Sequence, residues 1–335
     1  MPLGAWVAAR LTAQWAGPGV AWGARLLQPL SWLYALLAGA HRALYAGGLR
    51  RTLRAPVPLL VVGNLVAGGA GKTPTVMALV ALLRQQGWTP GVISRGHGRQ
   101  GDAVQAVHRD SPAEAVGDEP LLIHLHTGAP VVVGRDRVAA ARALCAAHPA
   151  VDILVADDGL QHHRLHHDMA VLVFDDRGAG NRLLLPAGPL REPKSRLASV
   201  DAVIQVVRGT APPQAIDRAW RADYTAGQAY RLRVPREKSA LTDLPPRDWL
   251  AVTGIGRPQG FFDMLQQQGV RFSPRAFADH HAFQPQDLPA DGAVLMTEKD
   301  AVKCQGFAGE HWWAVQLDVA PEAGFIHWLD ARLTQ

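Results

Sequence analysis

Residues 68–73 read Gly-Gly-Ala-Gly-Lys-Thr and form the segment of this sequence best suited to chemistry on phosphates. Glycines let several backbone N–H groups turn toward one polyphosphate, and the first turn of a following helix adds a favourable dipole. The lysine can neutralise the β- and γ-phosphates, and the threonine hydroxyl can bind Mg²⁺. We therefore predict a P-loop that binds ATP and Mg²⁺ for phosphoryl transfer. Its expected phosphate-binding residues are Gly68, Gly69, Ala70, Gly71, Lys72, Thr73 and Pro74.

The loop is a variant of the usual P-loop pattern. Val66 stands where the strict pattern has a glycine, and additional glycines occupy positions 68 and 69. Pro74 is compatible with the start of a helix, because the first helical turn can spare a backbone N–H. A flexible turn without a ligand is the alternative. The apolar run before the loop and the helical pattern after it favour the phosphate site.

Two adjacent carboxylates, Asp157 and Asp158, follow the apolar residues 153–156. Mg²⁺ is a hard cation that prefers oxygen ligands, and P-loop enzymes use an acid at the end of a neighbouring strand to hold it. A solvated turn after the strand is the alternative. Together with Thr73, both aspartates are therefore predicted metal ligands.

The polar segment at 117–120, Gly-Asp-Glu-Pro, admits two interpretations. Asp118 precedes an expected helix, and a helix N-cap is its favoured role on the sequence alone, because aspartate is common at that position. The functional alternative is a general base that accepts a proton from a hydroxyl group. The residues by themselves leave this choice open.

Histidines gather in two places after the acidic pair. His162, His163, His166 and His167 have a spacing that can bind zinc, but no cysteine accompanies them, and zinc binding is not favoured. The second group is Asp-His-His at 279–281, in an expected loop, where histidines are most often at the surface.

Apolar runs that alternate with amphipathic stretches from residue 58 onward predict the scaffold for these groups. Strands alternating with helices indicate an α/β fold of the P-loop NTPase type, in which a mostly parallel sheet is flanked by helices. The expected strands are 58–63, 91–94, 130–134, 152–157, 170–174, 201–207, 249–253, 293–297 and 312–317, and the expected helices are 73–86, 137–147 and 259–268.

The chain of 335 residues is long enough for two domains. The pattern breaks at 208–245, which is rich in proline and charge and is interpreted as a domain connection. We expect an N-terminal amphipathic, membrane-associated segment at 1–54, a P-loop kinase domain at 55–225, and a smaller α/β domain at 226–335. Two cysteines, Cys145 and Cys304, are too few for a disulfide framework and indicate a reducing compartment.

The net charge of +5 conceals an asymmetry along the chain. The first 101 residues contain ten Lys or Arg and no Asp or Glu, so the remaining 234 residues are net −5. A cationic end on an otherwise acidic chain indicates an anionic partner, either a membrane surface or a nucleic acid. The arginines are spread among leucines and tryptophans without a nucleic-acid motif, so we expect no nucleic-acid binding.

The N-terminal segment has the composition of a helix that lies in a membrane interface. One helical face carries Leu26, Leu30, Leu33, Leu37 and Leu44, accompanied by Trp15, Trp22, Trp32, Tyr34 and Tyr45. The least interrupted apolar run, 26–40, has 15 residues, fewer than the roughly 20 needed to cross a bilayer. The alternative is a helical cap on the following sheet, with the same leucines as core.

Taken together, these segments resemble one family, the tetraacyldisaccharide 4′-kinases of lipid A biosynthesis. Each matching stretch is weak alone, but the set runs in the family's order from residue 58 to about 303. The stretches are 61–64 (Val-Val-Gly-Asn), 68–74, 94–96 (Ser-Arg-Gly), 117–120, 157–162, 185–193, 253–256 (Thr-Gly-Ile-Gly), 277–281 and 297–300 (Thr-Glu-Lys-Asp).

The resemblance implies an enzyme that is peripheral to the cytoplasmic face of the inner membrane of Gram-negative bacteria, and we expect it to act as a monomer. It would use ATP and Mg²⁺ to phosphorylate the 4′-hydroxyl of tetraacyldisaccharide 1-phosphate, giving lipid IVA. Lys72 would act on the phosphates, and Asp118 would be the base or hydroxyl-orienting group, paired with His280 from the second domain. The implied metal ligands are Thr73, Asp157 and Asp158, and the implied substrate residues are Asn64, Glu119, Gln161, His162, Arg191 and Glu192.

Two departures from the family pattern stand in or near these motifs. His97 replaces a usual tyrosine, which leaves the contact made there open, and Ala70 replaces a common threonine in the loop, with little expected effect. The choice of His280 over His281 is also open. A membrane-associated ATPase switch or chaperone is the rival function, because variant P-loops with extra glycines occur in such proteins, but it would need no sugar-lipid acceptor.

Overall fold

The structure, a computed structural model, describes residues 15, 19–208 and 212–334. Within these residues the strands form one continuous sheet. Its members are β1 (Leu59–Gly63), β2 (Pro90–Ser94), β3 (Gln105–Ala106), β4 (Val131–Val133), β5 (Ile153–Asp157), β6 (Met169–Asp175), β7 (Ala202–Val207), β8 (Ala219–Arg231), β9 (Lys238–Ser239), β10 (Trp249–Thr253), β11 (Phe272–Ala276), β12 (Val294–Thr297) and β13 (Trp312–Pro321).

The strand order is β11-β10-β12-β13-β8-β7-β6-β1-β5-β2-β4-β3, with β9 paired to β8. Most neighbours are parallel, and the antiparallel pairs are β13 with β8, β8 with β9, and β3 with β4. Strands β1, β5 and β6 are buried along their whole length, because helices or loops cover both faces of a parallel sheet. The predicted α/β fold with a mostly parallel sheet is confirmed.

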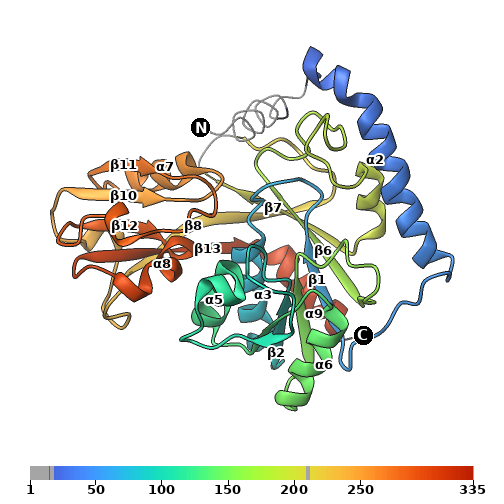
Figure 1. The fold of residues 1–335 in the computed structure, drawn as a ribbon, viewed down its shortest axis with the longest axis horizontal. Coiled ribbons are helices and arrows are strands. Elements are labelled where there is room, and N and C mark those ends of the chain that lie inside the picture. Colours follow the sequence, from blue (N-terminus) through green and yellow to red (C-terminus); the bar gives the residue numbers. More distant parts are fainter. Residues whose placement is uncertain (1–14, 16–18, 209–211, 335) are drawn as a thin grey trace.

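Helices lie on both faces of this sheet (Figure 1). The α-helices are α2 (Trp22–Ala46), α3 (Lys72–Gln85), α4 (Ala113–Val116), α5 (Asp118–Thr127), α6 (Arg137–Ala147), α7 (Pro258–Gln267), α8 (Glu298–Cys304) and α9 (Ala323–Leu333). Short 3₁₀ turns occur at Lys194–Ser199, Leu241–Asp243, Pro285–Asp287 and Gln305–Phe307. Local chemistry sets several of these ends: the Asp136 carboxylate, for example, accepts hydrogen bonds from the first N–H groups of α6.

The core is divided into layers by the sheet. Leu79 of α3, Ile123 of α5 and Phe325 of α9 pack in one buried cluster against Leu60 and other residues on one sheet face. A second cluster holds α6 against the opposite face. At the β10–β12 end, α7 and α8 pack in two further clusters. Both halves of the sheet are therefore covered on two sides, with the carboxyl ends of β1 and β5 left for the site.

The segment interpreted from the sequence as a connection, 208–245, contains a long strand. Strand β8 pairs with β7 through its first half and with β13 along its length, so it joins the two halves of the sheet (Figure 1). It crosses residue 225, where the sequence places a domain boundary. Helix α9, near the end of the chain, returns to the cluster of α3 and α5. The domain boundaries remain a prediction.

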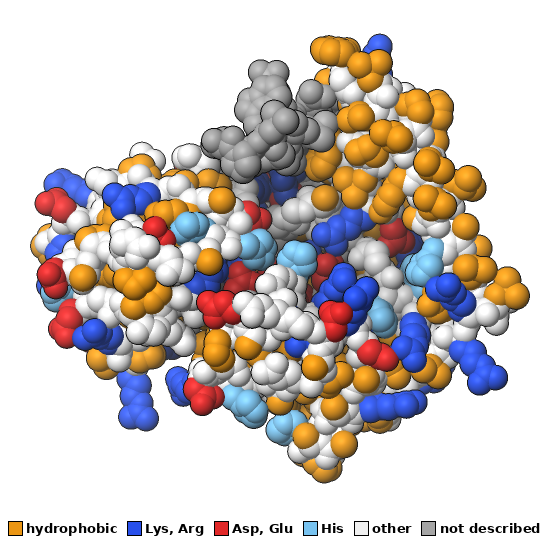
Figure 2. Space-filling view, in the orientation of Figure 1, with side chains coloured by type: hydrophobic (Ala, Val, Ile, Leu, Met, Phe, Trp, Pro, Cys, Tyr) orange, Lys and Arg blue, Asp and Glu red, His pale blue; other side chains and the backbone are white. Residues whose placement is uncertain are grey.

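Helix α2 runs along one side of the molecule with its apolar face outward (Figures 1 and 2). Leu26, Leu33 and Leu37 are 69%, 53% and 62% exposed, so the alternative in which these leucines form core is wrong. No helix within the described residues is long and apolar enough to span a bilayer. Residues 1–14 and 16–18 of the expected N-terminal segment lie outside the described part of the chain.

Candidate active site

The phosphate-binding loop lies between β1 and α3, where the sequence predicts it. Gly68 and Gly71 have φ of 97° and 84°, in the left-handed region that glycine tolerates best. The Gly71 carbonyl accepts a hydrogen bond of 2.8 Å from the Thr75 hydroxyl, which holds the loop against the helix. Gly71 is also the N-cap residue and has no side chain to occupy the first N–H groups of α3. Those groups are therefore available to an anion.

The loop forms one wall of a cavity of about 370 Å³. Residues 68–74 line it together with four of the other predicted site residues, Glu119, Asp158, Arg191 and His280. Figure 2 shows basic, acidic and histidine side chains gathered between the two parts of the molecule on the face in view. The cavity thus brings charged groups from both halves of the sheet to the phosphate-binding loop.

Asp157 ends β5 and is buried. Its Oδ2 accepts a hydrogen bond of 3.1 Å from Ser94 Oγ, whereas its Oδ1 has no hydrogen-bond partner within the part of the chain that the structure describes. Burial, followed by the nearby charges of Glu119 and Asp158, raises the pKa of Asp157. A bound cation would supply the partner that the free oxygen lacks and would favour the ionised form. This carboxylate therefore fits a Mg²⁺ ligand.

Asp158 lies beside the loop in a different environment. Its carboxylate is 3.6 Å from Lys72 Nζ and 3.2 Å from Arg191 Nη1. Burial alone would raise the pKa of Asp158, but Lys72 and Arg191 outweigh it and lower the pKa. No group of three or more His, Cys, Asp or Glu that could hold a metal occurs among the described residues. A Mg²⁺ ion here would take its remaining ligands from Thr73, phosphate and water, as is usual for this ion.

Asp118 is the first residue of α5, and Gly117 is the N-cap residue, so the N-cap interpretation of Asp118 is wrong. One carboxylate oxygen accepts a hydrogen bond of 2.9 Å from the Glu119 N–H, and the other lies 3.0 Å from His280 Nδ1. Burial alone would raise the pKa of Asp118. The His280 hydrogen bond and the charges of Lys299 and Lys303 outweigh burial and lower the pKa to about 2. Asp118 is therefore ionised at neutral pH.

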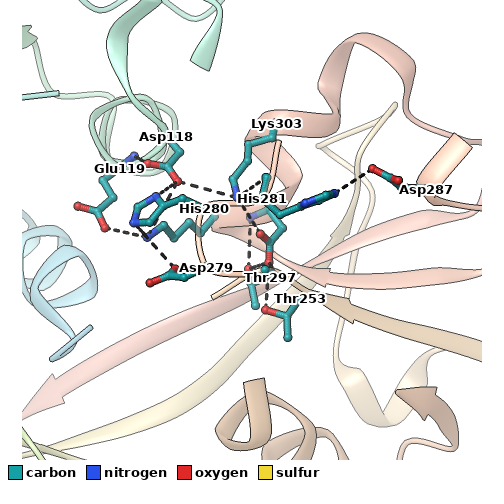
Figure 3. Close-up of polar contacts among 12 residues, drawn as sticks. Asp118, Glu119, Thr253, Asp279, His280, His281, Asp287, Thr297 and Lys303 are labelled. Carbon is teal, nitrogen blue, oxygen red and sulfur yellow. Dashed lines mark hydrogen bonds and ion pairs between the residues drawn. The ribbon is translucent and has the colours of Figure 1, made fainter. Parts of the chain in front are cut away.

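His280 reaches Asp118 from the loop after β11 (Figure 3). Its φ of 58° is in the left-handed region, and its backbone N–H donates to the Gly254 carbonyl at 3.0 Å. His281 turns away and lies 3.0 Å from Asp287 Oδ2. The structure thus places His280 rather than His281 beside Asp118. The ring of His97, which replaces the usual tyrosine, lies 5.8 Å from the His280 ring.

We expect the substitution His280→Gln to destabilise the protein more at about pH 5.5 than at about pH 8.5. The Asp118 hydrogen bond raises the pKa of His280, with a further contribution from Asp279 against burial and Lys299. Because folding raises the pKa of His280, its pair with Asp118 stabilises the protein fully at pH values below the pKa of the unfolded state. This stabilisation is lost as the pH rises through the pKa of the folded state. Urea unfolding at both pH values measures this, with the exposed His148→Gln as control. Equal destabilisation at both pH values would contradict it.

Of the remaining predicted substrate residues, Gln161 links Asn64 to Glu192, and His162 follows Gln161 in the chain. Gln161 Nε2 donates to the Asn64 carbonyl at 3.2 Å and to Glu192 Oε1 at 2.9 Å. Burial, then the charge of Arg137, lowers the pKa of His162 to about 4. These four residues, Asn64, Gln161, His162 and Glu192, do not line the cavity, unlike Arg191. Asn64 reaches the phosphate-binding loop directly, because its Nδ2 donates to the Gly68 carbonyl at 3.4 Å, and Glu192 directly follows Arg191.

Sequence reasoning missed several charged residues of the cavity. Arg257 pairs with Asp176, and the Arg208 guanidinium lies 4.7 Å from the centre of the Tyr224 ring. Lys299 lies beside Glu119 and His280. Sequence motifs could have identified two of these residues: Arg257 directly follows the 253–256 motif, and Lys299 lies within the 297–300 motif. Arg208 had none, because its partner Tyr224 lies in the strand that the sequence did not indicate.

Comparisons with known proteins agree with this geometry. A family model described as Tetraacyldisaccharide-1-P 4′-kinase matches residues 23–334. A tetraacyldisaccharide 4′-kinase of Thiobacillus denitrificans is 57% identical over 311 residues, covering 92% of this chain and 94% of that protein. One of Methylibium petroleiphilum is 47% identical, covering 96% and 93%.

A solved structure shares the fold. LpxK from Aquifex aeolicus, in complex with ATP, matches with a TM-score of 0.78 and 27% identity, covering 93% of this chain and 98% of that one. The family match, the relatives and the shared fold extend over nearly the whole described chain. The chain therefore belongs to the tetraacyldisaccharide 4′-kinase family.

Proposed function

We propose that this protein transfers the γ-phosphoryl group of ATP to the 4′-hydroxyl of tetraacyldisaccharide 1-phosphate, giving lipid IVA. The observation that carries the proposal is the Asp118–His280 pair, whose histidine lines the same cavity as the phosphate-binding loop. A kinase needs its base near the γ-phosphate, whereas an ATPase switch needs no such pair for a sugar hydroxyl. This arrangement, with the family, favours the kinase over the rival ATPase.

In the proposed reaction the phosphate-binding loop holds the triphosphate and Lys72 neutralises its β- and γ-phosphates. The 4′-oxygen attacks the γ-phosphorus, its proton passes to Asp118, and the bond to the β–γ bridging oxygen breaks to release ADP. His280 orients the Asp118 carboxylate through their hydrogen bond. Most of the rate enhancement in such a reaction comes from positioning and charge neutralisation.

Mg²⁺ is proposed as the cofactor, held by Thr73 and Asp157 with Asp158 beside them. The unpartnered, buried oxygen of Asp157 supports this assignment. When bound, the ion would neutralise charge on the ATP phosphates. Asp158 would at the same time keep Lys72 and Arg191 in place through its two ion pairs.

The glycolipid is proposed to bind between the cavity and α2. Arg191 is the cationic residue suited to a substrate phosphate, supported by Asn64, Gln161, His162 and Glu192 behind it, and Glu119 lines the cavity near the base. Helix α2 is attached to the Arg191 loop: Tyr34 Oη donates to the Arg191 carbonyl at 2.8 Å, and Ser31 Oγ donates to the Leu184 carbonyl at 2.9 Å. The acyl chains would then lie along the apolar face of α2.

The decisive experiment incubates purified protein with γ-labelled ATP, Mg²⁺ and the disaccharide lipid in detergent micelles. The proposal expects label on the extracted lipid, at the 4′-position, and none without the lipid. Label that appears only as inorganic phosphate would instead indicate the ATPase. Leaving out Mg²⁺ should abolish transfer to the lipid if the metal assignment is right.

The protein is further proposed to act as a monomer on the cytoplasmic face of the inner membrane, with α2 in the lipid interface. The double substitution Leu33→Glu/Leu37→Glu should weaken binding to anionic vesicles at least about tenfold, because each exposed leucine contributes apolar area to the bilayer. Vesicle co-sedimentation measures this. Val234→Glu, at an exposed residue away from α2, is the control, and unchanged binding of the double variant would remove α2 from the interface.

We also propose that the two predicted domains, divided at residue 225, move relative to each other. Asp118 and Lys72 come from the first part, and His280 from the second, so closure of the two parts would assemble the site. Separate movement of parts 55–225 and 226–335 would have to occur within β8, which is part of both halves of the sheet.

A further inference from the structure

The 297–300 motif has no role in the reaction as described so far. It forms the junction where β12 ends and α8 begins. Lys299, in the first turn of α8, lines the cavity together with the phosphate-binding loop. Its Nζ donates a hydrogen bond of 2.9 Å to Glu119 Oε1, and lies 3.4 Å from His280 Nε2 and 4.0 Å from Asp118 Oδ2. A cation therefore lies directly beside the proposed base.

Buried hydrogen bonds at the start of α8 fix the backbone position of Lys299. Asp300 is fully buried, and its Oδ2 accepts from Thr297 Oγ1 at 2.7 Å, Thr253 Oγ1 at 3.1 Å and the Gly254 N–H at 3.0 Å. This network ties the start of α8 to the loop after β10, whose Gly254 carbonyl also holds His280. The backbone of Lys299 is thus positioned together with His280, while its side chain, 18% exposed, extends to the cavity.

The neighbouring lysine of α8 is held differently. Lys303 Nζ donates to Asp300 Oδ1 at 3.0 Å and to the His281 carbonyl at 3.3 Å, and its side chain is 8% exposed. It lies 3.9 Å from Asp118 but does not line the cavity. Lys303 is therefore committed to the protein interior, whereas Lys299 has access to a bound ligand.

The carboxylates at the acceptor end of the cavity favour a cation on this side, in addition to Arg191, Arg208 and Arg257, which also line the cavity. The acceptor end carries Asp118, Glu119 and Asp279, all of which would repel an approaching γ-phosphate. Lys72, at the other end, is already beside Asp158. During transfer, negative charge also spreads over the oxygens of the phosphoryl group. A cation located between the carboxylates and the phosphoryl group would offset both effects.

We propose that Lys299 is a further catalytic residue. During phosphoryl transfer its ammonium group moves away from Glu119 and contacts the non-bridging oxygens of the phosphoryl group. The proposal rests on the proposed kinase function. It also explains how a strongly acidic carboxylate can act as a base: movement of Lys299 away from Asp118 removes one of the cations that keep the pKa of Asp118 low.

The test compares Lys299→Met with the wild-type protein in the labelled-ATP assay. Removing the charge is expected to lower kcat by about 10²–10³-fold, the effect of losing one donor to transition-state charge, with KM for ATP little changed. Lys299→Arg, which keeps the charge, should recover at least part of the rate. Lys238→Met, at an exposed lysine of β9, is the control and should be fully active.

The Glu119→Gln variant and the Glu119→Gln/Lys299→Met double variant distinguish a catalytic role of Lys299 from a purely structural one. If Lys299 only holds Glu119, then Glu119→Gln lowers kcat as much as Lys299→Met, and the double variant is no worse. That result, or a kcat of Lys299→Met near the wild-type value, overturns the proposal. Melting temperatures identify a variant that fails to fold, and Lys299→Gln then takes its place. Wild-type protein that labels no lipid would refute the proposed function itself.

Discussion

Replacing Asp118 with alanine is expected to lower turnover by about 10²–10⁴-fold, the usual contribution of a general base, while ATP affinity stays near the wild-type value. Asp118 contacts His280 and lies within 4.0 Å of Lys299 and Lys303, so it sits at the acceptor end of the site. It makes no contact with the phosphate-binding loop that would explain a loss of ATP binding. Steady-state kinetics with saturating lipid, together with ATP titration, measures both effects.

The Asp118 variant needs a control for stability, because it removes the carboxylate that His280 contacts at 3.0 Å and that lies within 4.0 Å of two lysines. Asp118→Asn keeps the shape and the acceptor oxygen for the Glu119 N–H, and it should be nearly as slow as the alanine variant. Asp110→Ala, at an exposed position, should be fully active. A near-normal rate in a folded Asp118→Asn protein would show that this carboxylate does not accept the proton.

Replacing Lys72 with alanine is expected to lower kcat/KM for ATP by about 10³-fold. The ammonium is the loop's charge toward the β- and γ-phosphates, and it lies 3.6 Å from Asp158. Without it, the Asp158 charge is offset only by Arg191 and Arg137 and is less well screened from the triphosphate. The labelled-lipid assay over a range of ATP concentrations measures the loss.

The fold should survive the Lys72 substitution, because residues of α3 such as Leu79 and Leu83 provide its buried contacts. A melting temperature close to that of the wild type is therefore part of the prediction. Lys238→Ala, at an exposed lysine, serves as the matched control. If the Lys72 variant retained most of its transfer activity, the triphosphate would have to lie elsewhere than on residues 68–73.

The central part of the fold could be predicted because its signals are local. Strands such as β1 and β5 are buried on both faces, so their sequences are continuous apolar runs. Strand β8 has no such run, since only Ala222 and Ala229 are buried within it. It is a strand because β7 and β13 supply its hydrogen-bond partners, and β13 begins 81 residues after the last residue of β8. No local pattern carries that information.

The active site likewise combines features that the local sequence predicts with features that depend on residues far apart in the chain. Glycines with positive φ before a helix, and carboxylates directly after an apolar strand, depend on neighbours in the chain, and both appeared where the sequence predicts them. The partnership of Asp118 with His280 joins residues 162 positions apart. The family resemblance supplied that pair, but composition and spacing favoured a helix cap for one member and a surface position for the other.

By itself, the sequence determined the α/β scaffold, the phosphate-binding loop and the acidic strand end, because backbone preference and burial of consecutive residues are encoded locally. Tertiary structure alone decided that His280 rather than His281 faces Asp118, that β8 joins the two halves of the sheet, and that Lys299 lies beside the proposed general base. Each of these depends on groups far apart in the chain that meet only when the sheet closes its two halves around one cavity.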